Sequence, residues 1–241
     1  MTNKIPIKEW LERYDKVKDL LVSPVNYHEY FEADEVEGYK LHVLDMGEVH
    51  FPTGHILAQD PLTWLRRDSQ AYLQSVPPGG YRLETLVVEL GADHYRYALS
   101  RVRFNAGNPV VYHMALKGDE DLSQVEEGII FGFVVDAGLG TLVDVATRDA
   151  YCDFEEGWYA ENPGTNIYDD FFAHRFLESY QANPEFQREL GDWINFEIPG
   201  TGLRIPMIQS GYGDGLYPVY FGYDAAGNLC DVVIEFIYLG D

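Results

Sequence analysis

Cysteine is scarce in this sequence: among 241 residues, only Cys152 and Cys230 carry a thiol. They lie far apart, and neither belongs to a CxxC or Cys/His ligand pattern, which excludes a disulfide framework and a zinc site of the usual spacing. Long apolar stretches are missing too. The chain contains no run of about 18 apolar residues, the length of a membrane span, and its first residues lack the apolar core of a signal peptide. We therefore expect a cytoplasmic protein without a membrane partner.

Basic side chains are few as well. The sequence has 17 Lys and Arg against 40 Asp and Glu, which gives a net charge of −23 at pH 7. Such a charge opposes approach to phosphate backbones, so nucleic acid is excluded as a partner class. Either solubility alone or binding of a basic partner protein or a cationic ligand explains the charge, and these explanations stay open.

Aromatic residues, by contrast, are abundant. The 13 Phe, 18 Tyr and 4 Trp supply enough apolar area for a large core. No internal repeat, low-complexity tract or flexible linker marks a boundary. We therefore predict that residues 1–241 form a single domain.

Apolar residues in the first part of the chain recur at three- and four-residue spacings, which predicts a helix within residues 1–22 that ends at Ser23-Pro24. From residue 39 to 145 the pattern changes to short β-type runs separated by turn residues. Residues 81–90 and 95–104 form a hairpin in this prediction, with the turn at residues 91–94. A second pair is expected between residues 110–116 and 130–135.

Helical spacing returns at residues 166–190, where Asn183-Pro184 predicts a break between two helices. Residues 194–239 are again β-rich, and a hairpin is expected around residues 224–228. Both faces of the last strand are apolar, so we expect it to lie in the middle of a sheet. The predicted fold is α+β: a large, mainly antiparallel β-sheet or sandwich with an N-terminal helix and a helical insertion.

Four short motifs follow one another along the chain. They are Gly54-His55-Ile56-Leu57-Ala58-Gln59-Asp60-Pro61-Leu62, Pro78-Gly79-Gly80-Tyr81, Val135-Asp136-Ala137-Gly138-Leu139-Gly140, and Ser210-Gly211-Tyr212-Gly213-Asp214-Gly215 with Tyr217. In order and spacing they resemble the bacterial domain-of-unknown-function 4241 family over roughly residues 41–236. Tyr212 departs from the pattern, where Trp is more usual. The resemblance implies a shared fold and brings no activity, substrate or catalytic residue with it.

Four aspartates, Asp60, Asp136, Asp144 and Asp214, lie beside Gly, Pro or a strand end. Such positions allow carboxylates from distant parts of a chain to meet in one site. Oxygen ligands would suit Mg²⁺, Mn²⁺ or Ca²⁺, and Asp60, Asp136 and Asp214 would then serve a metal-dependent hydrolase. Ordinary turns explain the same residues, and we expect no cofactor. Ser210 and Cys152 lack the surroundings of a catalytic nucleophile.

The segment 151–168 combines aromatic and acidic side chains. Rigid rings supply contact area and carboxylates orient a basic partner. A partner-binding edge is one interpretation, and an irregular loop whose rings cover the core is the other. The candidate binding residues are Asp153, Glu155, Glu156, Trp158 and Tyr159.

These observations favour an acidic cytoplasmic protein that binds a basic protein. The most concrete form is an immunity protein that neutralises a basic bacterial toxin, because charge complementarity speeds association and disfavours wrong partners. A metal-dependent hydrolase and a structural subunit of a homo-oligomer are the alternatives.

Overall fold

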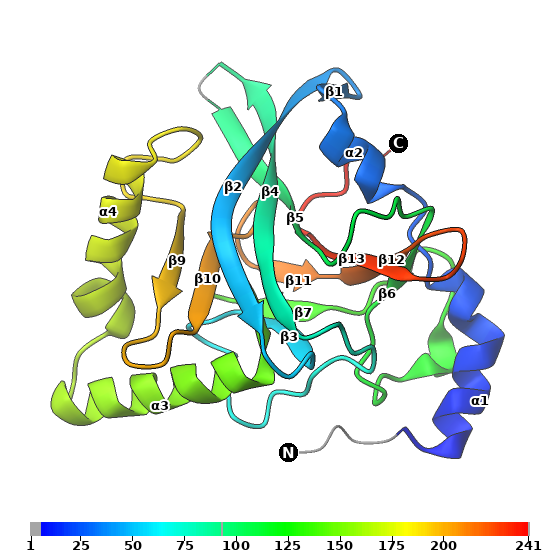
Figure 1. Cartoon of the computed structure of the whole chain (residues 1–241), viewed down its shortest axis with the longest axis horizontal. Coiled ribbons are helices and arrows are strands. Elements are labelled where there is room, and N and C mark those ends of the chain that lie inside the picture. Colours follow the sequence, from blue (N-terminus) through cyan, green and yellow to red (C-terminus); the bar gives the residue numbers. More distant parts are fainter. Residues whose placement is uncertain (1–5, 93, 241) are drawn as a thin grey trace.

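The computed structural model describes residues 6–92 and 94–240, and Figure 1 shows how their elements are arranged. Residues 1–5 of the predicted N-terminal helix and Asp93 of the predicted hairpin turn lie outside the described residues. The helical elements are α1 (Lys8–Val17), η1 (Lys18–Leu20), α2 (Tyr27–Glu32), η2 (Leu122–Gln124), α3 (Val145–Glu161), η3 (Tyr168–Phe172) and α4 (Ala173–Ala182). No described helix is long and apolar enough to cross a bilayer.

The strands account for most of the remaining ordered chain. They are β1 (Glu35–Val36), β2 (Tyr39–Phe51), β3 (Ile56–Gln59), β4 (Gly79–Gly91), β5 (His94–Arg103), β6 (Val111–Met114), β7 (Phe133–Val135), β8 (Leu139–Asp144), β9 (Trp193–Glu197), β10 (Arg204–Gln209), β11 (Gly215–Tyr217), β12 (Val219–Tyr223) and β13 (Leu229–Glu235). Together with the helices they give the predicted α+β fold, whose main feature is a large, curled antiparallel sheet.

The large sheet has the order β1-β2-β4-β5-β13-β12-β6, with antiparallel neighbours throughout. The β4–β5 and β12–β13 hairpins are both confirmed. So is the central place of the last strand, because Ile234 is registered with Ser100 of β5 on one side and with Val219 of β12 on the other. Strand β13 therefore joins the N-terminal and C-terminal parts of the sheet.

The expected pairing of residues 110–116 with 130–135 is wrong. Strand β6 adds to the edge of the large sheet beside β12, and β7 pairs with β11 in a separate two-stranded sheet. Nearness in sequence favoured the wrong pair, whereas the partners of both strands come from beyond residue 210. A four-stranded sheet, β3-β8-β10-β9, completes the β-structure.

Apolar side chains form three clusters. One lies between the large sheet and the smaller sheets, one between the large sheet and α1 with α2, and one beneath α3 and α4. Alternation along β13 shows how the sheet is covered on both faces. Val232 and Ile234 belong to the first cluster, and Val233 belongs to the second. In Figure 1, α3 and α4 lie at the opposite end of the molecule from α1.

Residues 151–168 do not form an irregular loop over their first part, because α3 continues to Glu161. Asp144 begins the helix by accepting a hydrogen bond from the Ala146 N–H at 2.8 Å. Tyr151, Phe154 and Trp158 follow at helical spacing and pack in or against the third cluster. The aromatic and acidic content of this segment obscured a periodicity that is plainly helical.

The predicted helical insertion is confirmed by η3, a π-helical turn, and by α4, which continues directly from it. The second helix expected after Asn183-Pro184 does not form, since residues 183–191 make turns instead. Those turns end at Gly191, whose φ of 85° lies in the left-handed region.

Candidate functional site

Asp60 holds two turns together. Its side chain is fully buried, and its Oδ1 accepts hydrogen bonds from the backbone N–H groups of Leu62 and Thr63 at 2.9 and 3.3 Å. Its Oδ2 accepts from the N–H groups of Asp136 and Ala137 at 3.0 and 2.6 Å. Both oxygens therefore have protein donors, and the carboxylate ties the 60–63 turn to the turn before β8.

Asp144 plays a similar part at the start of α3. Besides capping Ala146, it accepts hydrogen bonds from the backbone N–H groups of Thr53 and Gly54, each at 3.0 Å, and from the Thr53 hydroxyl at 2.9 Å. This carboxylate is also fully buried. N–H donors and a helix N-terminus stabilise its charge without a metal ion.

The other two aspartates are exposed. Asp136 accepts a hydrogen bond from the Trp64 indole at 2.7 Å. Asp214 precedes β11, where Gly215 is registered with Val135, so its turn adjoins that of Asp136. The turns carrying Asp60, Asp136 and Asp214 thus meet. Among residues 6–92 and 94–240, however, no group of three or more His, Cys, Asp or Glu side chains is placed to hold a metal ion.

Two acidic side chains of α3, Asp153 and Glu156, already form ion pairs with an arginine of the same chain. Arg67 Nη2 lies 2.6 Å from Asp153 and 2.9 Å from Glu156. Glu155 is partly buried, and this burial raises the pKa of its carboxyl group. A basic partner that binds these carboxylates would have to displace Arg67 from them.

The two aromatic candidates on α3 differ in exposure. Trp158 is half-buried and contacts Phe171 edge to face, with ring centroids 6.1 Å apart. Tyr159 is exposed, and its phenol oxygen accepts a weak hydrogen bond from the Ile167 N–H at 3.4 Å. Trp158 thus serves the core, while Tyr159 remains available at the surface.

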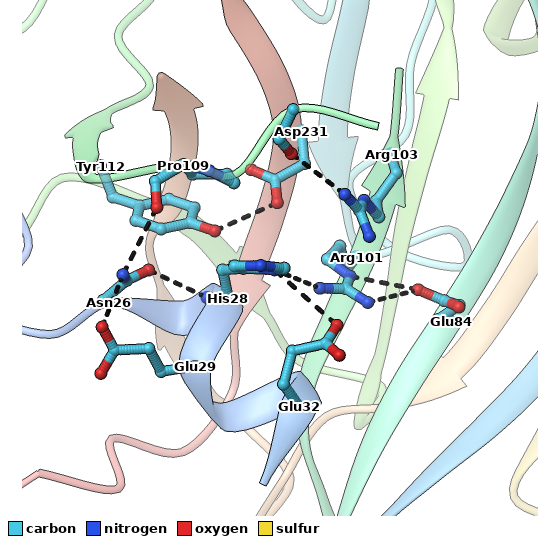
Figure 2. A network of polar contacts seen from close by, with 11 residues as sticks. Asn26, His28, Glu29, Glu32, Glu84, Arg101, Arg103, Pro109, Tyr112 and Asp231 are labelled. Atoms are coloured by element: carbon cyan, nitrogen blue, oxygen red, sulfur yellow. Dashed lines mark hydrogen bonds and ion pairs between the residues drawn. The ribbon is translucent and has the colours of Figure 1, made fainter. Parts of the chain in front are cut away.

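A polar network lies between α2 and the large sheet, and Figure 2 shows its members pointing toward one another from both sides. At its centre is Arg101 of β5, which is 3% exposed. Its guanidinium donates to one Glu84 oxygen at 2.8 and 3.1 Å and lies 3.8 Å from the centre of the Phe31 ring. His28 Nδ1 is 3.5 Å away. Burial and the charge of Arg101 lower the pKa of His28.

Asp231 of β13 extends this network. It is fully buried and accepts a hydrogen bond from the Tyr112 phenol at 3.1 Å, while its other oxygen has no hydrogen-bond partner in the described part of the chain. Burial raises the pKa of Asp231 to about 6. The facing residue is Gly222, and a Cβ there would come within 2.1 Å of Asp231 Oδ1. Glycine at this position makes room for the carboxylate.

Glu235 lies further along the same face of β13. The Tyr27 phenol of α2 donates to its Oε2 at 2.7 Å. The Tyr27 ring also packs against Tyr112 and Tyr220, with centroid distances of 4.9 and 5.3 Å. Burial raises the pKa of Glu235. Tyr27 therefore links the polar network to the cavity that Glu235 lines.

This cavity has a volume of about 570 Å³, within the usual range for ligand sites, about 300–1,000 Å³. Its walls come from segments far apart in sequence. They are Asp19, Leu20, Val22 and Pro24, then Met114, then residues 127–130, and finally Tyr220, Glu235 and Tyr238. Leu20, Ile130 and Tyr238 are exposed. We call this the Glu235 cavity.

The lining of the Glu235 cavity includes the carboxyl groups of Asp19, Glu127 and Glu235, and none of its described residues is Lys, Arg or His. One wall is formed by residues 127–130, the last part of a segment, residues 117–130, that we call the acidic loop. Trp10 of α1 fixes this loop by donating to the Glu120 carbonyl oxygen at 3.1 Å. The acidic side chains of the loop are Asp119, Glu120, Asp121, Glu126 and Glu127.

Sequence reasoning missed this cavity. Two signals were visible: the density of carboxylates at residues 119–127, and the two carboxylates, Asp231 and Glu235, in a strand that is otherwise apolar. A carboxylate at a buried position is unusual unless it is paired or functional. Only the fold brings the two signals together.

Comparison with known proteins identifies the family of the chain. No curated protein and no solved structure matches the chain. The family model described as a protein of unknown function, DUF4241, matches residues 49–234. This range includes all four motifs noted in the sequence, and it runs from the end of β2 almost to the end of β13. The chain belongs to the DUF4241 family.

Proposed function

We propose that this chain is a cytoplasmic binding protein that captures a basic protein, and that the acidic loop and the rim of the Glu235 cavity form its binding face. The observation that carries the proposal is the cavity itself, whose apolar walls contain three carboxyl groups and no described cation. Neutralisation of a basic bacterial toxin by an immunity protein is the most concrete form of this function.

The composition of the face supports a protein partner. Asp119, Asp121, Glu126 and Glu127 are exposed, and the exposed apolar side chains of Leu20 and Ile130 lie at the cavity rim. Apolar contacts at the centre of an interface supply affinity, while charges around them raise the association rate and reject acidic competitors. The net charge of −23 adds long-range attraction for a cationic protein.

The α3 surface is a secondary contact in this proposal. Arg67 neutralises much of the charge of Asp153 and Glu156. This surface therefore attracts a basic partner less strongly than the acidic loop does. The same ion pairs demonstrate that a guanidinium fits between the two carboxylates. Asp153, Glu155 and Glu156 would bind a partner only after Arg67 moved away.

Selection from a displayed peptide library tests the proposal and requires no identified partner. Peptides enriched on the wild-type protein should carry several Arg or Lys residues beside an aliphatic residue. Their association rate should fall by about tenfold or more between 20 and 150 mM salt, because charges at the rim act mainly on the on-rate.

Two variants that remove equal charge locate the face. The loop variant should lose the selected peptides, and the α3 variant should keep them. The loop variant carries Asp119→Asn, Asp121→Asn, Glu126→Gln and Glu127→Gln, and the α3 variant carries Asp153→Asn, Glu155→Gln, Glu156→Gln and Glu161→Gln. Enriched peptides without basic residues, or peptides that bind the loop variant like the wild type, would contradict the proposal.

A further inference from the structure

We infer that the Glu235 cavity is a guanidinium site that receives one arginine side chain of the partner, with the Glu235 carboxylate as its counter-charge. This inference deepens the proposed function and rests on it for the source of the arginine. Leu20, Val22 and Pro24 line the cavity together with Tyr220 of β12 and Glu235 of β13, and its volume of about 570 Å³ is large enough for a long side chain.

Glu235 lines the cavity, and only one of its two carboxylate oxygens has a hydrogen-bond donor among the described residues. The Tyr27 phenol engages Oε2, and no hydrogen bond to Oε1 is found among residues 6–92 and 94–240, although the side chain is only 9% exposed. Burial makes the ionised form of this carboxyl group less favourable, as its raised pKa indicates. An entering donor cation would offset this effect, whereas an apolar side chain would increase it.

The rest of the lining favours guanidinium over ammonium. Tyr220 and Tyr238 both border the cavity, and a planar, weakly hydrated guanidinium gains more from aromatic faces and sheds its water more easily than an ammonium. The chain already contains such an arrangement nearby: Arg101 pairs with Glu84 and stacks on Phe31 beneath the same helix, α2. The Glu235 cavity provides a carboxylate and rings without the arginine.

Binding should also strengthen as pH rises. Glu235 must be ionised to hold a cation, and burial raises the pKa of its carboxyl group, so it loses its proton at a higher pH than an exposed glutamate does. Burial raises the pKa of the phenols of Tyr27 and Tyr30 of α2 and of Tyr220 of β12, which face Glu235 or border its cavity, so these groups stay neutral where the carboxyl group titrates. Tyr238, Asp19 and Glu127 also border the cavity.

The test uses small probes that differ in one property. N-acetyl-arginine amide, its lysine counterpart and its neutral isostere N-acetyl-citrulline amide are titrated into the full chain and followed by NMR. We expect the arginine probe to bind at least about fivefold more tightly than either of the others, with shifts centred on Ile129 and Tyr220. Equal binding of the citrulline probe, or shifts centred elsewhere, would overturn the inference.

Variants assign the effect to Glu235. Glu235→Gln keeps an acceptor for Tyr27 and should weaken the arginine probe at least tenfold, whereas Glu161→Gln, an equal charge change on α3, should leave it unchanged. Tyr238→Ala changes an exposed side chain at the rim and should weaken binding severalfold even if Glu235→Gln folds poorly. If a folded Glu235→Gln protein, or the Tyr238→Ala protein, binds the arginine probe as tightly as the wild type does, the inference of a guanidinium site is wrong.

The two proposals fail separately. If the loop variant captures selected peptides like the wild type, while the arginine probe still depends on Glu235, the cavity binds guanidinium groups and the protein-binding face is wrong. If peptides require the acidic loop but the arginine probe ignores Glu235→Gln, the face stands and the guanidinium site is wrong.

Discussion

The phenol of Tyr27 and the carboxylate of Glu235 are 208 residues apart in the chain, and their oxygens lie 2.7 Å apart in the fold. This hydrogen bond fastens α2 to the centre of the large sheet. It also occupies one of the two carboxylate oxygens of Glu235, a residue that lines the cavity. One contact thereby contributes both to stability and to the shape of the proposed site.

Replacing Tyr27 with Phe should therefore lower the free energy of unfolding by roughly 1–3 kcal/mol, because it leaves a buried carboxyl group without its donor. Chemical denaturation measures this loss. Tyr212, which is 69% exposed, provides the control: Tyr212→Phe should be neutral. Equal stability of Tyr27→Phe and the wild type would show that the hydrogen bond does not anchor α2.

Asp231 should impose a pH dependence on stability. Its pKa is raised to about 6 in the folded protein from 3.8, so the native state binds the proton more tightly than the unfolded chain does. The contribution is fully present below pH 4 and is lost as pH rises to about 6. Asp231→Asn should match the wild type at pH 4 and exceed it by up to about 3 kcal/mol at pH 7. Urea denaturation across this range tests the difference, and a constant offset between the two proteins would refute the assignment.

Gly191 should tolerate no side chain. A Cβ at this position would lie 2.0 Å from the Phe176 carbonyl oxygen, and the backbone is left-handed as well. Gly191→Ala should cost more than about 3 kcal/mol, or prevent folding, through clash and strain together. Gly138→Ala is the matched control, since Gly138 is also left-handed but has open space around it. That change should cost only about 1–2 kcal/mol. Similar losses at the two sites would mean that the close approach to Phe176 is absent in solution.

The turn aspartates should act on stability rather than on metal binding. Asp144→Ala removes the cap of α3 and the tether to Thr53 and Gly54, so it should cost at least about 1–2 kcal/mol. Mg²⁺, Mn²⁺, Ca²⁺ and Zn²⁺ should leave the melting temperature unchanged. A rise in melting temperature with one of these ions that disappears in Asp60→Asn would instead support the metal-dependent hydrolase.

Local patterns predicted much of this fold. Apolar side chains on both faces of β13 predicted its place in the middle of the sheet, and the turn residues at 224–228 predicted its hairpin. Pattern reasoning failed where pairing is set by distant segments, as for β6 and β7. It also failed at α3. The acidic and aromatic composition around Asp153 and Glu156 favoured a binding edge or a loop, whereas the spacing of Tyr151, Phe154 and Trp158 is helical.

The candidate site was less predictable for a related reason. The turns of Asp60, Asp136 and Asp214 do meet, but sequence could not reveal that backbone N–H groups already saturate Asp60. The Glu235 cavity collects residues from four regions of the chain. Charge density in the acidic loop was visible in the sequence, whereas its position beside Glu235 depends on how α1 and β12 pack.

The position of β13 also constrains the order in which the protein can fold. Strands β5 and β12 never touch each other in the large sheet, because residues 229–235 separate them. A ribosome releases β1 to β5 long before it makes β13, and until then the inner edge of β5 is an open pairing surface. We therefore expect the two parts of the large sheet to join only after residues 229–235 have been synthesised. A chain truncated before residue 229 should aggregate rather than form a smaller folded protein.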